Sequence, residues 1–252
     1  MARGGAGMAR TLARTVTQPG TWGRKGATVV VVLLAVLAVS LPPAAAQTVD
    51  EPGTYKGRKI ADVMSFRGAG WLERATRIEE ENPDALIAAL PIDKGMLVVD
   101  IGCGSGYHAR RLAAAVGPEG TVLCNDIQPQ MLRIASELAA REGITNISTV
   151  LGTEDDPNLP EGEVDLMLIV DVYHEFSQPE PMLHAMREAL APDGVIALVE
   201  FRLEGRSAAH IKLDHRMSIE QVMKEWIPAG YELVERIDSL PTQHLFLFRA
   251  AR

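Results

Sequence analysis

The sequence predicts an α/β protein whose doubly wound sheet has seven strands, mostly parallel, with an antiparallel strand near the carboxyl terminus. Short apolar runs alternate with stretches that are apolar at helical spacing, which implies parallel strands joined by right-handed crossovers. A glycine-rich turn follows the first apolar run. The last two runs have no helix between them, and this favours an antiparallel strand there.

Seven runs have the length and the apolar character of strands. They cover residues 96–101, 121–125, 147–151, 164–170, 194–201, 231–237 and 244–248. The first run, MLVVDI, is apolar enough to be buried on both faces of a sheet.

Apolar residues at helical spacing predict helices around 109–116 and 131–138. Two later helices are expected to begin at capping boxes, in which a serine is followed three residues later by a glutamate or glutamine. The boxes pair Ser177 with Glu180, for a helix through Leu190, and Ser218 with Gln221, for a helix that closes at Gly230.

The first 46 residues have the features of a secretory signal peptide. They contain five arginines and lysines and no acid, a 15-residue apolar run over 27–41, and small residues before Gln47. We therefore expect an exported protein, periplasmic or secreted. Two alternatives remain open: an uncleaved membrane anchor over 26–46, or translation that begins downstream, for example at Met64.

Residues 47–95 are polar and helix-like, and we expect them to precede one α/β domain over 96–252. This lead-in either forms a lid over a substrate or packs as a helix against the edge of the sheet. The side chains that suit a lid are Tyr55, Arg58, Trp71 and Arg74.

The charge and the cysteine content exclude several classes of function. Without its first 46 residues the chain holds 20 basic and 33 acidic side chains, a net charge of −13. Such a body is a poor nucleic-acid binder, because that binding depends on basic groups that neutralise phosphates. Two cysteines are too few for a disulfide framework or a cysteine-rich zinc site. Cys103 and Cys124 are expected to be small buried side chains, and a bridge between them requires an oxidising compartment and suitable geometry.

A glycine loop and an acid form the principal motif. Gly102, Gly104 and Gly106 follow the first predicted strand at alternate positions, and Asp126 ends the second. Glycines allow a tight turn and a close approach of a ligand to the backbone, and an acid at the second strand suits ribose hydroxyls. The G-x-G-x-G spacing differs from the G-x-G-x-x-G of pyrophosphate-binding proteins, and so favours a nucleoside without phosphates.

Here the residues carry a resemblance. VVDIGCGSG and NDIQPQML resemble the first two motifs of class I S-adenosylmethionine-dependent methyltransferases. The resemblance implies a Rossmann-like seven-stranded sheet with S-adenosylmethionine as cofactor. It implies that the glycine loop, with Asp100 beneath it, receives the methionine portion, and that Asp126 and Ile127 hold the ribose end.

The third motif of that family places an acid beside the adenine amine. This sequence has Thr153 directly after the glycine, so either Glu154 or Asp155 takes this role. The chain is similar to a little-characterised bacterial group with a predicted signal peptide, which shares its lead-in and the segment 171–176. Asp171, at the start of that segment, is also expected beside the cofactor.

The segment 171–176 leaves the end of the fourth strand and is expected to form the floor of the active site. His174 is the first candidate for a general base, because the pKa of histidine lies near neutral pH. Tyr173 and Glu175 are alternatives as bases or as substrate hydrogen-bond partners. The competing interpretation is that His174 only caps a turn or packs under a helix. Lys212, His215 and His244 form a second, weaker group of candidates.

No catalytic metal is expected from the sequence. Asp171 suits one position of a hard-cation site, but Glu200-Phe201-Arg202 stands after the fifth strand in place of a second set of oxygen ligands.

These observations predict a methyltransferase that acts on a small molecule or lipid by in-line transfer, with membrane contact only through an uncleaved leader. The alternative is an exported protein that binds S-adenosylmethionine or another nucleoside without transferring a methyl group. A nucleotide-dependent oxidoreductase is disfavoured by the spacing of the loop.

Overall fold

The structure is a computed structural model, and it describes residues 50–252. These residues belong to one compact unit, Thr48–Arg252. The predicted signal peptide, and the anchor that is its alternative, lie outside the described residues. Within the described part of the chain, no helix has both the length and the apolar character needed to cross a membrane.

A seven-stranded sheet forms the centre of the unit, in the order β5-β4-β3-β6-β7-β9-β8. Strands β3 to β7 pair in parallel, and β9 is antiparallel to both of its neighbours. The predicted fold class is therefore confirmed. The strands are β3 (Leu97–Ile101), β4 (Thr121–Asp126), β5 (Ile147–Leu151), β6 (Val164–Val170), β7 (Leu190–Phe201), β8 (Tyr231–Ile237) and β9 (Gln243–Ala250).

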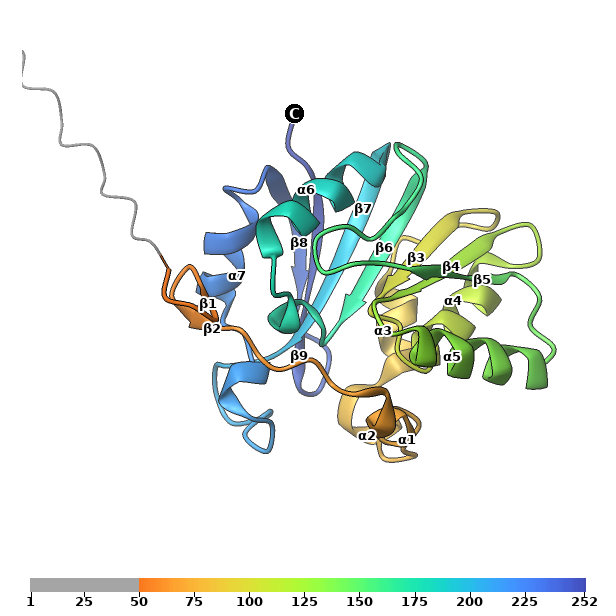
Figure 1. Ribbon diagram of the computed structural model, residues 1–252, viewed down its shortest axis with the longest axis horizontal. Coiled ribbons are helices and arrows are strands. Elements are labelled where there is room, and N and C mark those ends of the chain that lie inside the picture. Colours follow the sequence, from red (N-terminus) through yellow and green to blue (C-terminus); the bar gives the residue numbers. More distant parts are fainter. Residues whose placement is uncertain (1–49) are drawn as a thin grey trace, which may run out of the picture. The chain divides into compact units, whose positions relative to one another are not determined.

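Helices cover both faces of this sheet (Figure 1). Helices α3 (Pro83–Ala89), α4 (Tyr107–Val116) and α5 (Pro129–Arg141) contribute to one apolar core. Helices α6 (Pro179–Ala189) and α7 (Ile219–Trp226) contribute to a second core on the other face. The sheet is thus buried on both sides, as expected for parallel strands with crossover helices.

Strand β3 illustrates why these sequences form buried strands. Successive side chains of a strand point to opposite faces, so Val98 packs into one core and Val99 into the other. Both side chains are fully buried. Burial of both faces explains why the run is apolar throughout and does not alternate with polar residues.

The lead-in crosses the carboxyl ends of the parallel strands (Figure 1). The amide of Ala61 donates to the carbonyl of His174 at 3.0 Å, and Gln128 bonds the backbone of both Met64 and Phe66. The lead-in therefore lies where ligands of open α/β sheets bind. Its elements are β1 (Thr54–Tyr55), β2 (Arg58–Lys59), the one-turn 3-10 helix η1 (Phe66–Gly68), α1 (Ala69–Leu72) and α2 (Arg77–Glu81).

One of the two predicted capping boxes is wrong. Helix α6 begins at Pro179 after Gln178, and no side chain caps it. The hydroxyl of Ser177 donates instead to Glu154 at 2.8 Å. The second box is correct at its first position, because Ser218 accepts a bond from the amide of Gln221 at the start of α7.

Candidate active site

The glycine loop turns sharply between β3 and α4. Gly102, Gly104 and Gly106 all have positive φ, between 54° and 77°, a region that residues with a side chain rarely adopt. A Cβ atom on Gly102 would lie 2.4 Å from Cγ1 of Val172, and one on Gly104 would lie 2.6 Å from Cδ1 of Leu72. These positions therefore require glycine for conformation and for space.

Asp126 ends β4 beside this loop. Its Oδ2 accepts a bond from the amide of Gly104 at 3.0 Å, and its Oδ1 accepts one from the amide of Gln128 at 2.8 Å. Burial raises the pKa of the Asp126 carboxyl, although these backbone bonds oppose the shift. Each carboxylate oxygen keeps a further lone pair, so the side chain can still accept bonds from a ribose.

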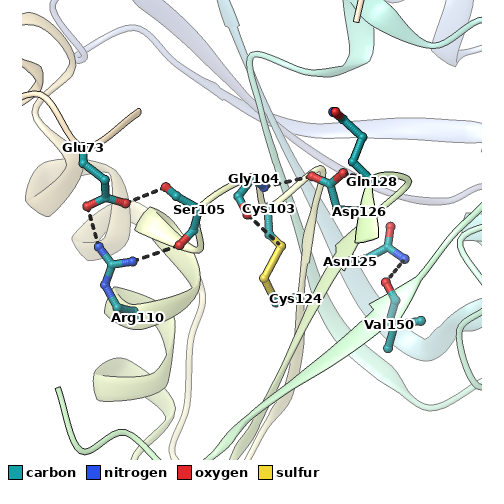
Figure 2. The surroundings of a disulfide bond; sticks show 10 residues. All are labelled: Glu73, Cys103, Gly104, Ser105, Arg110, Cys124, Asn125, Asp126, Gln128 and Val150. Carbon is teal, nitrogen blue, oxygen red and sulfur yellow. Dashed lines mark hydrogen bonds and ion pairs between the residues drawn. A yellow bond between two sulfur atoms is a disulfide. The ribbon is translucent and has the colours of Figure 1, made fainter. Parts of the chain in front are cut away.

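A disulfide joins Cys103 in the glycine loop to Cys124 in β4 (Figure 2). The two Cα atoms are 5.4 Å apart, and both side chains are buried. Parallel pairing of β3 with β4 places Asp100 opposite Cys124, so Cys103 lies three residues along and just beyond the strand end. The bridge therefore ties the loop to the strand that ends in Asp126.

Two acids that line the pocket, Asp100 and Asp171, each have an enclosed carboxylate oxygen. Asp100 Oδ2 and Asp171 Oδ1 are enclosed and have no hydrogen-bond partner among the described residues. Burial raises the pKa of Asp100 to about 7, and burial followed by the charge of Glu81 raises that of Asp171. The other oxygen of Asp171 accepts a bond from Gln243 at 2.6 Å.

Arg77 and His108 also line this pocket, and neither was expected from the sequence. Arg77 donates to Glu81 at 2.6 Å and lies 3.1 Å from Nε2 of His108. Burial lowers the pKa of His108, as do the neighbouring arginines. No local pattern identifies these two residues, because α2 and α4 meet only in the folded chain.

The structure separates the two acids that are candidates for contact with adenine. Ile127, Thr153 and Glu154 line the pocket, whereas Asp155 does not. The carboxylate of Asp155 instead accepts a bond from the hydroxyl of Thr153 at 2.6 Å within its own turn. Of the two, Glu154 is therefore the acid that the fold brings to the pocket.

The lead-in supplies an apolar wall to the same pocket. Trp71 and Leu72 belong to α1, and Leu72 reaches the glycine loop. Arg74 stacks over the indole of Trp71, with its guanidinium carbon 3.6 Å from the ring centroid. Tyr55 and Arg58 are not among the lining residues. The apolar lining residues outside the glycine loop are Val63, Met64, Trp71, Leu72, Ile101, Tyr107, Ile127, Met131, Val170, Val172, Phe176 and Met182.

The segment after β6 divides its side chains between different surroundings. Glu175 lines the pocket and accepts a bond from the amide of Met64. Tyr173 is fully buried, and its hydroxyl donates to Glu225 at 2.7 Å, away from the pocket lining. His174 is 1% exposed and its Nδ1 lies 2.6 Å from Oε2 of Glu200. Burial opposes protonation of His174, but Glu200 outweighs it and raises the pKa.

The structure thus brings most of the predicted site residues to one pocket. Those that line it are Asp100, Gly102, Gly104, Asp126, Ile127, Glu154, Asp171 and Glu175. Gly106, Asp155, Tyr173 and His174 are not in the lining. His244 also lies elsewhere, held by Asp238 and Glu204.

The glycine loop after β3, the acid at the end of β4 and the antiparallel strand β9 are typical of the class I S-adenosylmethionine-dependent methyltransferases. Residues 92–240 match the family model described as a methyltransferase domain, and the chain belongs to this family. The chain therefore contains a methyltransferase domain, and the cofactor of this class is S-adenosylmethionine.

Two relatives and one solved structure extend this result. The chain is 32% identical over 137 residues to nocamycin O-methyltransferase of Saccharothrix syringae, covering 54% of this chain and 49% of that protein. It is 30% identical over 165 residues to a ubiquinone/menaquinone biosynthesis C-methyltransferase of Cupriavidus taiwanensis, covering 62% and 64%. The fold matches a SAM dependent methyltransferase from Aquifex aeolicus with a TM-score of 0.68 at 22% identity, covering 74% of this chain and 98% of that one.

The polar groups of the pocket fit this cofactor. The unpartnered oxygens of Asp100 and Asp171 suit a cationic ammonium group such as that of methionine, because buried acceptors require a donor. Asp126 suits the ribose hydroxyls, and the space in front of Gly102 and Gly104 admits no side chain.

Proposed function

We propose that the protein transfers the methyl group of S-adenosylmethionine to a small molecule or lipid with an apolar body. The observation that carries this proposal is the apolar wall that the lead-in adds beside the cofactor motifs, centred on Trp71 and Leu72. Small-molecule pockets are mostly apolar with a few polar groups that orient the ligand. The relatives named for nocamycin and for ubiquinone/menaquinone biosynthesis support the same class of acceptor.

Glu175 is the polar side chain that we assign to the acceptor. It lines the pocket together with Phe176 and Met182, in the segment that follows β6, the strand next to β3. Methyl transfer depends mainly on an in-line approach of the acceptor to the sulfonium methyl, so orientation supplies much of the rate. A carboxylate at this position orients an acceptor hydroxyl or amine by accepting its hydrogen bond.

Calorimetric titration of the full chain with S-adenosylmethionine tests the cofactor, and transfer of a labelled methyl group to a panel of metabolites and extracted lipids tests the acceptor. We expect saturable binding and a labelled product, both lost in Gly104→Asp, whose side chain collides with Leu72 and repels Asp126. Binding without any product over the panel would favour the binding-only alternative. A folded protein that does not bind the cofactor would contradict the proposal.

We also propose that the methyltransferase works outside the reducing cytosol, as a periplasmic or secreted protein or one held by residues 26–46. Two independent features support this: the signal-like leader in the sequence and the buried Cys103–Cys124 bridge. Disulfides are rare in cytosolic proteins because thiols are kept reduced there. Fractionation of cells, sequencing of the mature amino terminus and counting of free thiols test the proposal. A cytosolic protein with two free thiols would contradict it.

A further inference from the structure

Three side chains beside the active site form a group of potential metal ligands, and one of them, Glu175, is also the side chain that we assign to the acceptor. His174, Glu175 and His215 each offer one ligand atom, and these atoms lie within 4.8 Å of one another. The two histidine rings are 5.0 Å apart between centroids. His215 comes from the one-turn 3-10 helix η3 (Leu213–His215), while the other two come from η2 (Tyr173–Glu175), so the fold joins residues about forty positions apart.

His174 has a nitrogen for which the described residues provide no partner. Its Nε2 is buried and makes no hydrogen bond, and the residue is 1% exposed. A buried polar atom without a partner is costly, so such an atom indicates a missing ligand. Because Nδ1 is hydrogen-bonded to Glu200, the neutral ring carries its proton on Nδ1 and its lone pair on Nε2.

Both histidines are held in the way that metal-ligating histidines usually are. Nδ1 of His174 is bonded to the carboxylate of Glu200 at 2.6 Å, and Nδ1 of His215 to that of Asp214 at 2.9 Å. A carboxylate on the second ring nitrogen fixes the tautomer and makes the first nitrogen a better ligand. In both residues this leaves Nε2 as the nitrogen available to an ion.

The local charges also suit a cation. Glu175, Glu200 and Asp214 surround the two imidazoles. The nearby guanidinium of Arg58 is already paired with Glu225 at 2.8 Å and with the carbonyl of His174 at 3.0 Å.

We propose that His174, Glu175 and His215 form a binding site for a divalent transition-metal ion. Two imidazoles and one carboxylate are the ligand set of sites for ions such as Zn²⁺, Fe²⁺ and Co²⁺, and they leave coordination positions open. Ligand atoms about 2.1 Å from an ion lie at most about 4.2 Å apart, so a small movement of one side chain is enough to bring all three ligand atoms within reach of one ion. His215 can make this movement, because its side chain is 26% exposed and η3 is a single turn.

This proposal differs from the expectation that no catalytic metal is present, which rested on the residues after the fifth strand. The ligands lie instead on η2 and η3, and only the tertiary structure brings them together. Because Glu175 also lines the cofactor pocket, the ion stands at the wall of the acceptor space. This further role rests on the proposed function: the open coordination positions of the ion are available to an oxygen of the acceptor. Binding of the ion itself does not depend on methyl transfer.

The test measures metal binding directly, without S-adenosylmethionine. The full chain is purified with a tag that contains no histidine, treated with a chelator, and titrated with Zn²⁺ by calorimetry and with Co²⁺ by visible absorption. We expect one equivalent of each ion to bind and Co²⁺ to show ligand-field bands. His215→Ala should weaken binding by more than roughly 100-fold, and Asp214→Asn by about 10- to 100-fold through loss of the carboxylate partner.

His210→Ala is the matched control, because His210 is exposed on the same segment and lies outside the group. It should bind both ions as the unaltered chain does. Thermal unfolding without metal checks that His215→Ala folds. The proposal is overturned if neither ion binds at one equivalent, or if His215→Ala binds them as tightly as His210→Ala.

Discussion

The amide of Gly104 donates to Oδ2 of Asp126 at 3.0 Å, so the acid assigned to the ribose also holds the glycine loop in place (Figure 2). The cofactor loop and its acid are therefore one structural unit. The Cys103–Cys124 bridge also joins this loop covalently to β4, the strand that ends in Asp126.

Asp126→Ala should weaken S-adenosylmethionine binding by about 10- to 150-fold, which corresponds to the loss of a hydrogen bond to a charged group, about 1.5–3 kcal/mol. Calorimetric titration measures the change. Asp84→Ala, which removes an exposed carboxylate from α3, is the control and should bind normally. Equal affinities of the two variants would show that Asp126 does not contact the cofactor.

Gly102→Ala should destabilise the protein more than Gly95→Ala. Both glycines have positive φ, so both substitutions incur the conformational cost of about 1 kcal/mol. Only at Gly102 does the new Cβ also collide with Val172, whereas nothing lies within 4 Å at Gly95. Urea unfolding should show an additional loss of about 1–3 kcal/mol for Gly102→Ala. Indistinguishable losses would mean that the approach of Val172 is easily relieved.

Reduction of the Cys103–Cys124 bridge, or the double substitution to serine, should lower the free energy of unfolding by about 3 kcal/mol. The bridge closes a loop of 21 residues, and this estimate follows from the chain entropy that it removes from the unfolded state. Urea unfolding with and without reductant measures the loss. The serine variant should not respond to reductant, and a reductant-independent stability of the unaltered protein would argue against a bridge.

Asp100→Asn should change how stability depends on pH. Burial raises the pKa of Asp100 to about 7, above its unfolded value, so the folded state binds the extra proton and stability falls as pH rises from about 4 to 7. Asparagine has no such proton. The variant should match the unaltered protein below pH about 4 and exceed it above pH about 7, by up to roughly 4 kcal/mol. Unfolding across this range tests the prediction, and parallel curves would contradict it.

Glu154→Gln should weaken binding of S-adenosylmethionine, whereas Asp155→Asn should not. Glu154 lines the pocket, and Asp155 is bonded to Thr153 within its own turn. A lost charge-assisted hydrogen bond to the adenine amine corresponds to a weakening of about 10-fold or more. Titration of both variants under the same conditions measures this. The reverse order of affinities would assign the adenine to Asp155.

Much of the fold was predictable because its signals are local in the chain. The apolar runs that became β3 to β9, the positive-φ glycines 102, 104 and 106, and Asp126 at a strand end all follow from residue type and spacing. The failed capping box at Ser177 shows the limit of such signals. Its hydroxyl bonds Glu154, a residue that only the fold brings close.

The sequence by itself determined the sheet, the glycine loop and the acid that faces it, because short patterns of residue type and spacing predict backbone conformation and burial. The tertiary structure alone decided that Cys103 pairs with Cys124 and that Leu72 covers Gly104. It alone turned Tyr173 toward Glu225 and Glu175 toward the pocket, and set His215 beside His174. These contacts join distant segments, and their geometry depends on how helices and strands pack, which no local spacing records.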